Sequence, residues 1–290
     1  MIQSHRSEGL IIKLGFHVSI EGGIDKAVDR AMELRCDAFQ IFTRNPRSWA
    51  YRDLREGEVE AFREKRDRAG IDPVFGHMPY ILNLASPSEE IYRRSVGSLS
   101  AELRRCSALG VPMLVTHIGS HMGSGLEEGI ERVVGALNLA LKGDDSEVSV
   151  LLENGPGSRN SVGSRFEEIR AILYGVAQRE RVAVCLDTCH AFAAGFDLRT
   201  QEGLGAMLEL FETDVGFDRL KLVHLNDSVG GLGTGVDHHE HIGLGEIGLE
   251  GFRLILRSSL AEAPMIMETP VDERRPDEEN MRIARELASA

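Results

Sequence analysis

The stretch VCLDTCHAFAAG, Val184 to Gly195, is the part of the chain from which its fold can be worked out. The apolar residues 184–186 are followed directly by Asp187, and His190 lies three residues after Asp187. This order is typical of a buried strand that ends in metal ligands, and the small residues after it allow close backbone packing. If one strand ends in this way, the ends of the other strands become the places to examine.

Strand-like and helix-like segments alternate along the rest of the chain. Strands are expected at residues 11–18, 38–43, 73–77, 113–118, 148–154, 182–188, 220–226 and 264–269. Helices are expected at residues 23–34, 56–69, 89–109, 126–141, 165–176, 201–215, 249–260 and 277–288. Strands that alternate with helices pair in parallel, so this pattern predicts an α/β fold of the (β/α)8 TIM barrel type. We expect one barrel domain over residues 11–290, preceded by a flexible extension at residues 1–10.

Composition limits the class of protein. The formal net charge is −13, which argues against nucleic-acid binding through a general basic surface. A local basic patch, or bound divalent cations in one cleft, would still permit it. The four cysteines include no CxxC pair, and no apolar run is long enough to cross a bilayer. These features predict a soluble, cytoplasmic protein that makes no contact with membranes.

The third to eighth expected strands each end in a potential metal ligand. Barrel enzymes build their sites at the carboxyl ends of the strands, so these side chains should share one rim. A lone buried His or Glu is usually just hydrogen-bonded, whereas this repetition favours a multinuclear metal site. The nine candidate ligands, two of which come from the long loop at residues 227–248, are His77, His117, Glu153, Asp187, His190, His224, Asp237, His239 and Glu268.

The ligand types and their spacing indicate more than one ion. Imidazole and carboxylate groups without thiolate suit zinc, manganese or iron, and nine ligands exceed what one ion needs, so two or three ions are implied. Asp237 and His239 are two residues apart and would face the same side of an extended segment, where both can chelate one ion. Asp187 and His190 are three apart and would face opposite sides, which assigns them to different ions.

Several segments carry a resemblance to a known family. From about Gly15 to Pro270, the chain resembles the endonuclease IV family of abasic-site DNA repair enzymes. The segments that carry it are HMPYILNLASP, VTHIGSH, LLENGPGSRNSVG, VCLDTCHAFAAGFDLRT, LVHLNDS, VDHH, IGLGEIG and METP. The resemblance implies a barrel holding three zinc ions, with manganese as a partial substitute. It also implies that a metal-activated hydroxide hydrolyses double-stranded DNA on the 5′ side of abasic sites and leaves a 3′-hydroxyl end. This reaction belongs to base excision repair, and no obligate protein partner is implied.

The resemblance also divides the ligands among the ions. It implies one zinc site of His77, His117 and Glu153. A second site would consist of Glu153, Asp187, His224 and Glu268, and a third of His190, Asp237 and His239. Glu153 would be the catalytic carboxylate, since it bridges two ions, and His17 would lie behind the ligands rather than bind an ion.

DNA contacts are expected on the loop after the second strand. The stretch TRNPRSWAYRD, Thr43 to Asp53, mixes arginines with aromatic residues, including Trp49. By resemblance, Arg47, Tyr80 and Ile81 occupy positions where the family inserts side chains into the duplex to flip the abasic nucleotide. The alternative is that the aromatic residues cap the barrel rim and the arginines are solvated.

Some alternatives stay open at this stage. Met78 and Pro79 depart from the family pattern, and a shift of one residue could place His238 rather than His239 in the third site. A sugar isomerase or epimerase uses a similar barrel with one or two ions, and a DNA-binding protein without turnover is a third possibility. The number of bound ions and an incision assay would separate these functions.

Overall fold

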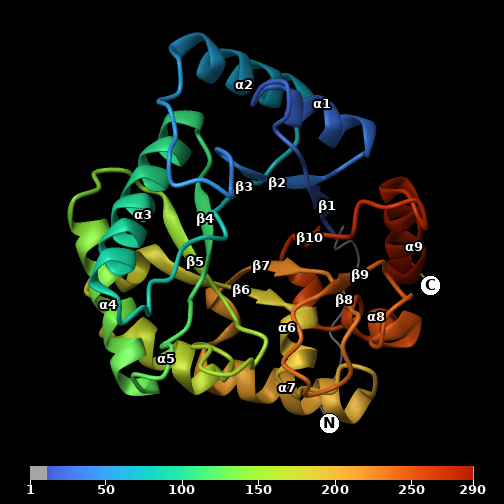
Figure 1. Cartoon of the computed structure of the whole chain (residues 1–290). Coiled ribbons are helices and arrows are strands. Elements are labelled where there is room, and N and C mark those ends of the chain that lie inside the picture. Colours follow the sequence, from blue (N-terminus) through green and yellow to red (C-terminus); the bar gives the residue numbers. More distant parts are fainter. Residues whose placement is uncertain (1–11, 290) are drawn as a thin grey trace.

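The computed structural model describes residues 12–289, so the extension expected at residues 1–10 lies outside the described residues. Eight parallel strands close into a barrel in the order β1-β10-β7-β6-β5-β4-β3-β2 (Figure 1). The strands are β1 Leu14–His17, β2 Ala38–Phe42, β3 Val74–His77, β4 Met113–His117, β5 Ser149–Glu153, β6 Val182–Asp187, β7 Leu220–His224 and β10 Met265–Met267. The fold class predicted from the sequence, a single (β/α)8 TIM barrel, is therefore confirmed.

Helices cover the outside of the barrel (Figure 1). They are α1 Lys26–Glu33, α2 Glu56–Ala69, α3 Glu89–Leu109, α4 Leu126–Lys142, α5 Phe166–Gly175, α7 Gln201–Asp214, α8 Gly248–Ile255 and α9 Asp277–Ser289. Helices α2 and α3 end where predicted, because Gly70 and Gly110 adopt the left-handed conformation that ends a helix. The helix expected at residues 249–260 is shorter, and a 3-10 turn at Ser259–Glu262 follows it.

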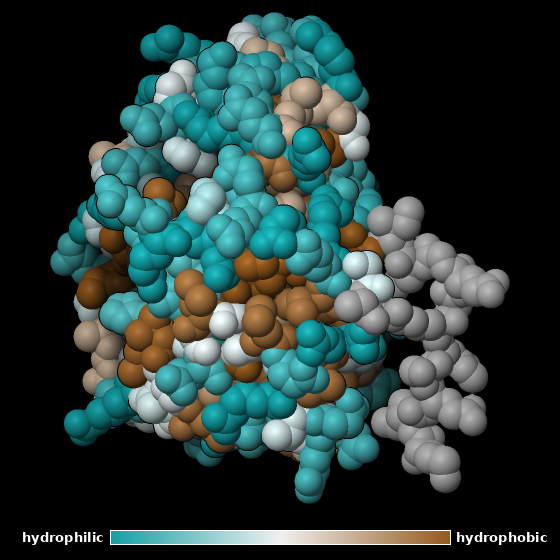
Figure 2. Space-filling model, turned by 90° about the vertical axis from the view of Figure 1, so that its right-hand side faces the viewer, coloured by the Kyte–Doolittle hydropathy of each residue, from teal (hydrophilic) through white to brown (hydrophobic). Residues whose placement is uncertain are grey.

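Apolar side chains lie on both faces of the barrel wall, which is why the strands read as nearly continuous apolar runs. One cluster fills the barrel interior and includes Phe75, Val115 and Leu151. A much larger cluster lies between the strands and the helices. Seen from the side of α8 and α9, the outer surface is mainly hydrophilic, with hydrophobic residues gathered in the lower half of the view (Figure 2). Among the described residues, no helix is long and apolar enough to span a membrane.

Two short elements at the rim were not predicted. Residues Thr188–Ala193 form helix α6 directly after β6. The segment 227–248, expected to have no strand character, contains an antiparallel pair of β8 Asp227–Ser228 and β9 His239–Glu240. Both elements depend on contacts made across the rim, which local sequence periodicity does not report.

The strand register brings the ends of neighbouring strands to one level. His117 of β4 is paired with Glu153 of β5, and Asp187 of β6 is paired with His224 of β7. Because the strands are parallel, all of these residues lie at the same end of the barrel. The rim is therefore lined by imidazole and carboxylate groups.

Candidate metal centre

The first group of candidate ligands joins β3, β4 and β5. Nε2 of His77 lies 3.3 Å from Oε2 of Glu153, and Nε2 of His117 lies 3.1 Å from the same oxygen. His77 and Glu153 are buried, and His77 Nδ1 lies 2.7 Å from the carbonyl oxygen of Met78, to which it can donate. That contact leaves Nε2 as the nitrogen that faces Glu153.

The second group is formed by Glu153, Asp187, His224 and Glu268. Nδ1 of His224 lies 2.9 Å from Oε1 of Glu153, 3.4 Å from Oε2 of Glu268 and 3.7 Å from Oδ2 of Asp187. Oε2 of Glu153 therefore faces the first group and Oε1 faces the second, so the two groups share this carboxylate.

The third group differs from the expected set. Ligand atoms of Asp187, His190 and His239 lie together, so Asp187 borders the second and third groups. Asp237 is half-exposed, and its Oδ1 lies 2.9 Å from Nε2 of His190 and 3.6 Å from Nε2 of His239. The premise of an extended chain between Asp187 and His190 is wrong, because α6 begins there.

Asp187 caps helix α6 and so sets the position of His190. Its Oδ1 accepts a hydrogen bond of 2.7 Å from the backbone N–H of His190. Its Oδ2 accepts one of 2.6 Å from the amide of Asn226. Asn154 lies on the other side, where its Oδ1 accepts from the backbone N–H of Asp187 at 2.7 Å. The Asn226 amide and the first turn of α6 thus hold the carboxylate of Asp187, and Asn154 holds its backbone.

Electrostatic interactions among these groups are strong because they are buried. Burial alone would raise the pKa of Glu153, but the neighbouring imidazoles of His117 and His224 hold that pKa well below its ordinary value. Glu268 behaves in the same way: burial opposes ionisation, and His224 and His17 together keep its pKa low. Positive charge close to these two carboxylates, whether from imidazolium groups or from bound cations, therefore favours their ionised form.

The residues present fit divalent metal ions. The donor set is imidazole nitrogen and carboxylate oxygen, which suits zinc and related ions. Nε2 of His239 is buried and has no hydrogen-bond partner among the described residues, although it lies 3.7 Å from Oδ2 of Asp187. A buried nitrogen without a partner is costly, and coordination of a cation would satisfy it.

Asp227, a residue not singled out in the sequence, anchors the loop that carries Asp237 and His239. Its buried carboxylate accepts hydrogen bonds from four backbone N–H groups, those of Ser228, Gly243, Gly245 and Ile247. These bonds join both ends of the loop at one point. The loop is long, but its base is fixed.

The mouth of the centre is a cavity of about 370 Å³ lined by Tyr80, His117, His190, Asp237, His238, His239, Glu268 and Pro270. Tyr80 is 55% exposed, and its ring centroid lies 4.9 Å from that of Phe42 and 6.1 Å from that of His77. Ile81 follows it and is half-buried. The aromatic ring therefore stands at the opening of the cavity.

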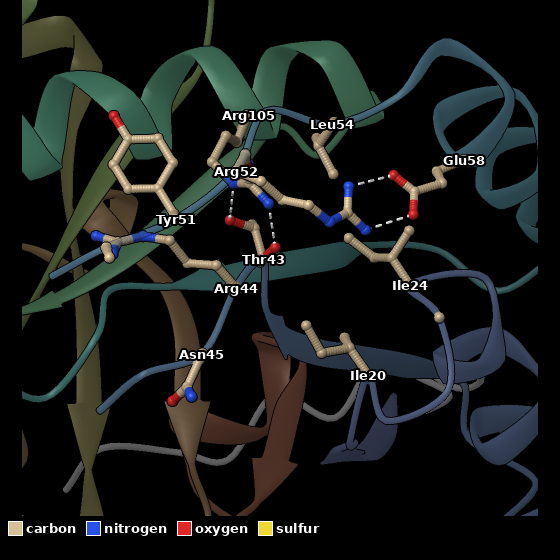
Figure 3. Close-up of a pocket in the computed structure, with 12 residues that line it drawn as sticks. Ile20, Ile24, Thr43, Arg44, Asn45, Tyr51, Arg52, Leu54, Glu58 and Arg105 are labelled. Carbon is tan, nitrogen blue, oxygen red and sulfur yellow. Dashed lines mark hydrogen bonds and ion pairs between the residues drawn. The ribbon is translucent and has the colours of Figure 1, made fainter. Parts of the chain in front are cut away.

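The loop after β2 lies against α3 through buried arginines (Figure 3). Arg44 pairs with Glu102, which is fully buried, and Arg105 donates to the hydroxyl of Thr43 at 2.8 Å and to the carbonyl of Arg52 at 2.9 Å. These contacts border a separate cavity of about 300 Å³. The loop is held from its inner side.

The exposed part of this loop carries the residues expected to contact DNA. Arg47 is exposed, while Trp49 is half-buried with the guanidinium of Arg94 4.5 Å from its ring centroid. Tyr51 has Arg44 at 4.6 Å from its ring. The aromatic side chains therefore pack against arginines of their own chain, and Arg47 remains outside this packing.

Two further histidines of the described residues have structural partners, and a third is exposed. Nδ1 of His121 accepts hydrogen bonds from the backbone N–H groups of Gly123 and Gly125, which makes it a turn residue. His241 is buried 3.0 Å from Asp272, and His238 is exposed at the mouth of the cavity. His239, not His238, lies in the third group.

Sequence reasoning missed three buried amides beside the ligands: Gln40, Asn154 and Asn226. Gln40 is fully buried and contacts both His224 and Glu268. Each amide lies within an apolar strand or no more than two residues after one, and a polar residue in such a run is a signal that could have been used.

Comparisons with known proteins give a consistent result. The family model of xylose isomerase-like TIM barrels matches residues 28–289. A protein of Methanoculleus marisnigri named probable endonuclease 4 is 54% identical over 282 residues, covering 97% of this chain and 100% of the relative. A Cenarchaeum symbiosum protein of the same name is 48% identical over 280 residues, covering 96% and 100%.

Solved structures agree with these relatives. The crystal structure of endonuclease IV from Thermus thermophilus matches with a TM-score of 0.84 and 41% identity, covering 96% of this chain and 99% of that one. A D-tagatose 3-epimerase-like protein matches with a TM-score of 0.72 but only 20% identity, covering 95% and 97%. The second likeness is one of fold alone.

Proposed function

This chain belongs to the endonuclease IV family within the xylose isomerase-like TIM barrels, and on that premise we propose that it is an abasic-site DNA repair endonuclease. Its substrate is double-stranded DNA that contains an abasic site. It hydrolyses the phosphodiester bond on the 5′ side and leaves a 3′-hydroxyl end.

The observation that carries the proposal is the shared carboxylate of Glu153. One of its oxygens lies 3.1 Å from His117 Nε2, and the other lies 2.9 Å from His224 Nδ1. A carboxylate between two groups of ligands is the arrangement that a two-metal phosphodiesterase requires. Sugar isomerisation on this type of barrel has no use for the additional group around His190 and His239.

Three zinc ions are assigned to three sets of residues. The first set is His77, His117 and Glu153, the second is Glu153, Asp187, His224 and Glu268, and the third is His190, Asp237 and His239. Bound zinc supplies Lewis-acid stabilisation of phosphate charge and makes deprotonated water accessible near neutral pH. The support for the first two sets is the proximity of their ligand atoms. The third set is supported by Oδ1 of Asp237, which lies 2.9 Å from Nε2 of His190 and 3.6 Å from Nε2 of His239, and by the unpartnered nitrogen of His239.

The chain's own residues bind and orient the substrate. The cavity of about 370 Å³ at the mouth suits a small ligand such as one sugar-phosphate unit that has left the stack. Arg47, Tyr80 and Ile81 are assigned to the space in the duplex that the flipped nucleotide leaves. Trp49 is assigned to DNA contact beside them, and His17 supports Glu268, with its Nδ1 3.0 Å from Oε1.

An incision assay with metal analysis tests the proposed function. Zinc-loaded protein should cut a duplex with one tetrahydrofuran abasic analogue, and a polymerase should extend the new 3′ end. Glu153→Ala should lower the rate at least ~100-fold, since even residues behind metal ligands are worth 10–100-fold. Glu128→Ala, which removes a carboxylate of α4 that pairs with Arg132, is the matched control and should cut normally.

The proposal fails if the metal-loaded protein leaves the abasic duplex intact. Three zinc ions per chain are expected by mass spectrometry. One or two ions, together with epimerisation of a ketose, would instead indicate a sugar epimerase. Tight binding of the abasic duplex without a product would indicate a binding protein.

A further inference from the structure

Gln40 is the one fully buried amide side chain of β2, and it lies between two members of the second ligand group. Its Oε1 is 3.0 Å from Nε2 of His224, and its Nε2 is 2.8 Å from Oε1 of Glu268. The same Nε2 is 2.9 Å from Nδ1 of His17. Gln40 is not a member of any of the three ligand sets, so those sets assign it no role.

The carboxylate of Glu268 decides which way the amide points. An ionised carboxylate accepts hydrogen bonds and donates none, so the NH2 group of Gln40 must face it. The opposite orientation would place two oxygens 2.8 Å apart. The carbonyl oxygen of Gln40 therefore faces His224, and Nε2 of His224 must carry a hydrogen.

This contact selects the ligand atom of His224. With Nε2 held as a donor to Gln40, the other ring nitrogen, Nδ1, faces the carboxylates of Glu153, Glu268 and Asp187. Metal-bound histidines commonly donate their second ring N–H to a neighbouring acceptor, which fixes both the tautomer and the plane of the ring. Gln40 supplies that acceptor here.

The same amide selects the ligand atom of Glu268. Oε1 of Glu268 receives the N–H of Gln40 at 2.8 Å, and Nδ1 of His17 lies 3.0 Å from the same oxygen. The bond from Gln40 to Oε1 leaves Oε2 as the oxygen that faces His224, at 3.4 Å. The side chain of Gln40 therefore determines which atom both the imidazole of His224 and the carboxylate of Glu268 present to the ion.

We propose that Gln40 is a positioning residue of the metal centre, which presents Nδ1 of His224 and Oε2 of Glu268 to the ion of the second group. The inference rests on the proposed function, because it takes His224 and Glu268 as metal ligands. Gln40 itself touches neither the ion nor the DNA.

Two substitutions separate the two contacts. Gln40→Met keeps the length of the side chain and removes both polar groups. Gln40→Glu keeps an acceptor for His224 but places a carboxylate oxygen against Glu268. Gln178→Met, in the connection between α5 and β6, is the control for the same change outside the centre.

Metal affinity and the histidine tautomer are the readouts, and neither needs turnover. In competition with a zinc indicator, Gln40→Met should weaken the most affected ion by roughly 10–100-fold, the usual effect of losing such a partner. Long-range ¹H–¹⁵N spectra of the zinc-loaded wild type should show His224 protonated at Nε2. Gln40→Glu should retain that signature while still losing affinity through Glu268, and Gln178→Met should match the wild type in both.

The inference is overturned if His224 of the wild type is protonated at Nδ1, or if Gln40→Met binds zinc with unchanged affinity. If circular dichroism shows that Gln40→Met does not fold, Gln40→Glu provides the test. A retained His224 tautomer with lowered zinc affinity in Gln40→Glu supports the proposal, and unchanged zinc affinity overturns it. A wild type that holds no ions or cuts no abasic DNA would refute the proposed function. If the wild type binds zinc and cuts abasic DNA, and the Gln40 variants bind zinc as tightly as the wild type, only the role of Gln40 is refuted.

Discussion

Asp187 combines two tasks in one side chain. Its carboxylate borders the second and third ligand groups, and its Oδ1 also caps the helix that carries His190. A capping interaction is worth ~1 kcal/mol, and asparagine caps a helix as well as aspartate does. Charge and cap can therefore be separated by substitution.

Asp187→Ala and Asp187→Asn should differ in whether they retain the third ion, the one assigned to His190. Both variants remove a charged ligand, so both should lose the ion of the second group. Asp187→Asn keeps the cap of α6 and should keep the third ion, whereas Asp187→Ala should lose it as well. Zinc counting by mass spectrometry after dialysis measures this difference, with His190→Ala as the variant that loses chiefly the third ion.

Equal zinc content in Asp187→Ala and Asp187→Asn would show that capping does not contribute to the third site. Loss of every ion from His190→Ala would contradict the separation of the groups.

Seven of the nine candidate ligands could be predicted from sequence because they occur at or near the end of a strand, and a parallel barrel gathers those ends. Asp237 and His239 were predicted from the length and composition of the loop after β7. The amides around the ligands could not be predicted in this way. Gln40 and Asn226 become meaningful only when the barrel closes and brings β2, β7 and β10 together at Glu268. The grouping of Asp187 with His190 was also beyond reach, since it depends on a helical turn rather than on an extended chain.

Among the elements, the loop after β7 depends most on a single anchor. The carboxylate of Asp227 accepts four backbone N–H bonds, two on each oxygen. Hydrogen bonds to a charged group contribute about 1.5–3 kcal/mol each and are not additive. Much of the order of this loop is therefore concentrated at one side chain.

Asp227→Ala should lower the free energy of unfolding by at least about 2 kcal/mol and speed amide exchange at Gly243, Gly245 and Ile247. It should also weaken the third ion, because the loop carries His239. Asp227→Asn retains one oxygen and should give an intermediate result. Urea denaturation and hydrogen exchange measure these effects, and equal behaviour of the two variants would refute the anchoring role.

The main elements of the barrel were predictable because apolar runs and helical periodicity are local. Helices α2 and α3 match their predicted ranges, and a left-handed glycine ends each of them. Helix α6 and the β8–β9 pair were missed for the opposite reason. Their residues gain order from contacts with distant parts of the rim, such as the hydrogen bond that the backbone N–H of Gly245 donates to Asp227.

For the whole molecule, the charge is the property that DNA binding must overcome. The net charge of −13 means that attraction to DNA must come from the ions of the centre and from a few exposed residues such as Arg47. Only a small number of phosphates should then be neutralised.

Binding to an abasic duplex should therefore depend weakly on salt. The slope of log K against log salt concentration should lie near −3 to −5, which corresponds to about three to six phosphate contacts. Fluorescence anisotropy on a non-hydrolysable abasic duplex with the zinc-loaded protein measures it. A slope of about −9 or steeper, as for ten contacts, would require a basic surface that the composition does not predict.

The buried pairing of Arg44 with Glu102, and of Arg105 with Thr43, divides the loop after β2 into two parts. The anchoring side chains belong to residue 44 and to α3, and Arg44 also donates to the carbonyl oxygens of Ser48 at 2.9 Å and Trp49 at 3.5 Å. Residues 45–47 form the turn between these anchored points. Substitutions in that turn should therefore change the contacts of the loop with DNA more than the stability of the barrel, provided that Arg44 and Glu102 are kept.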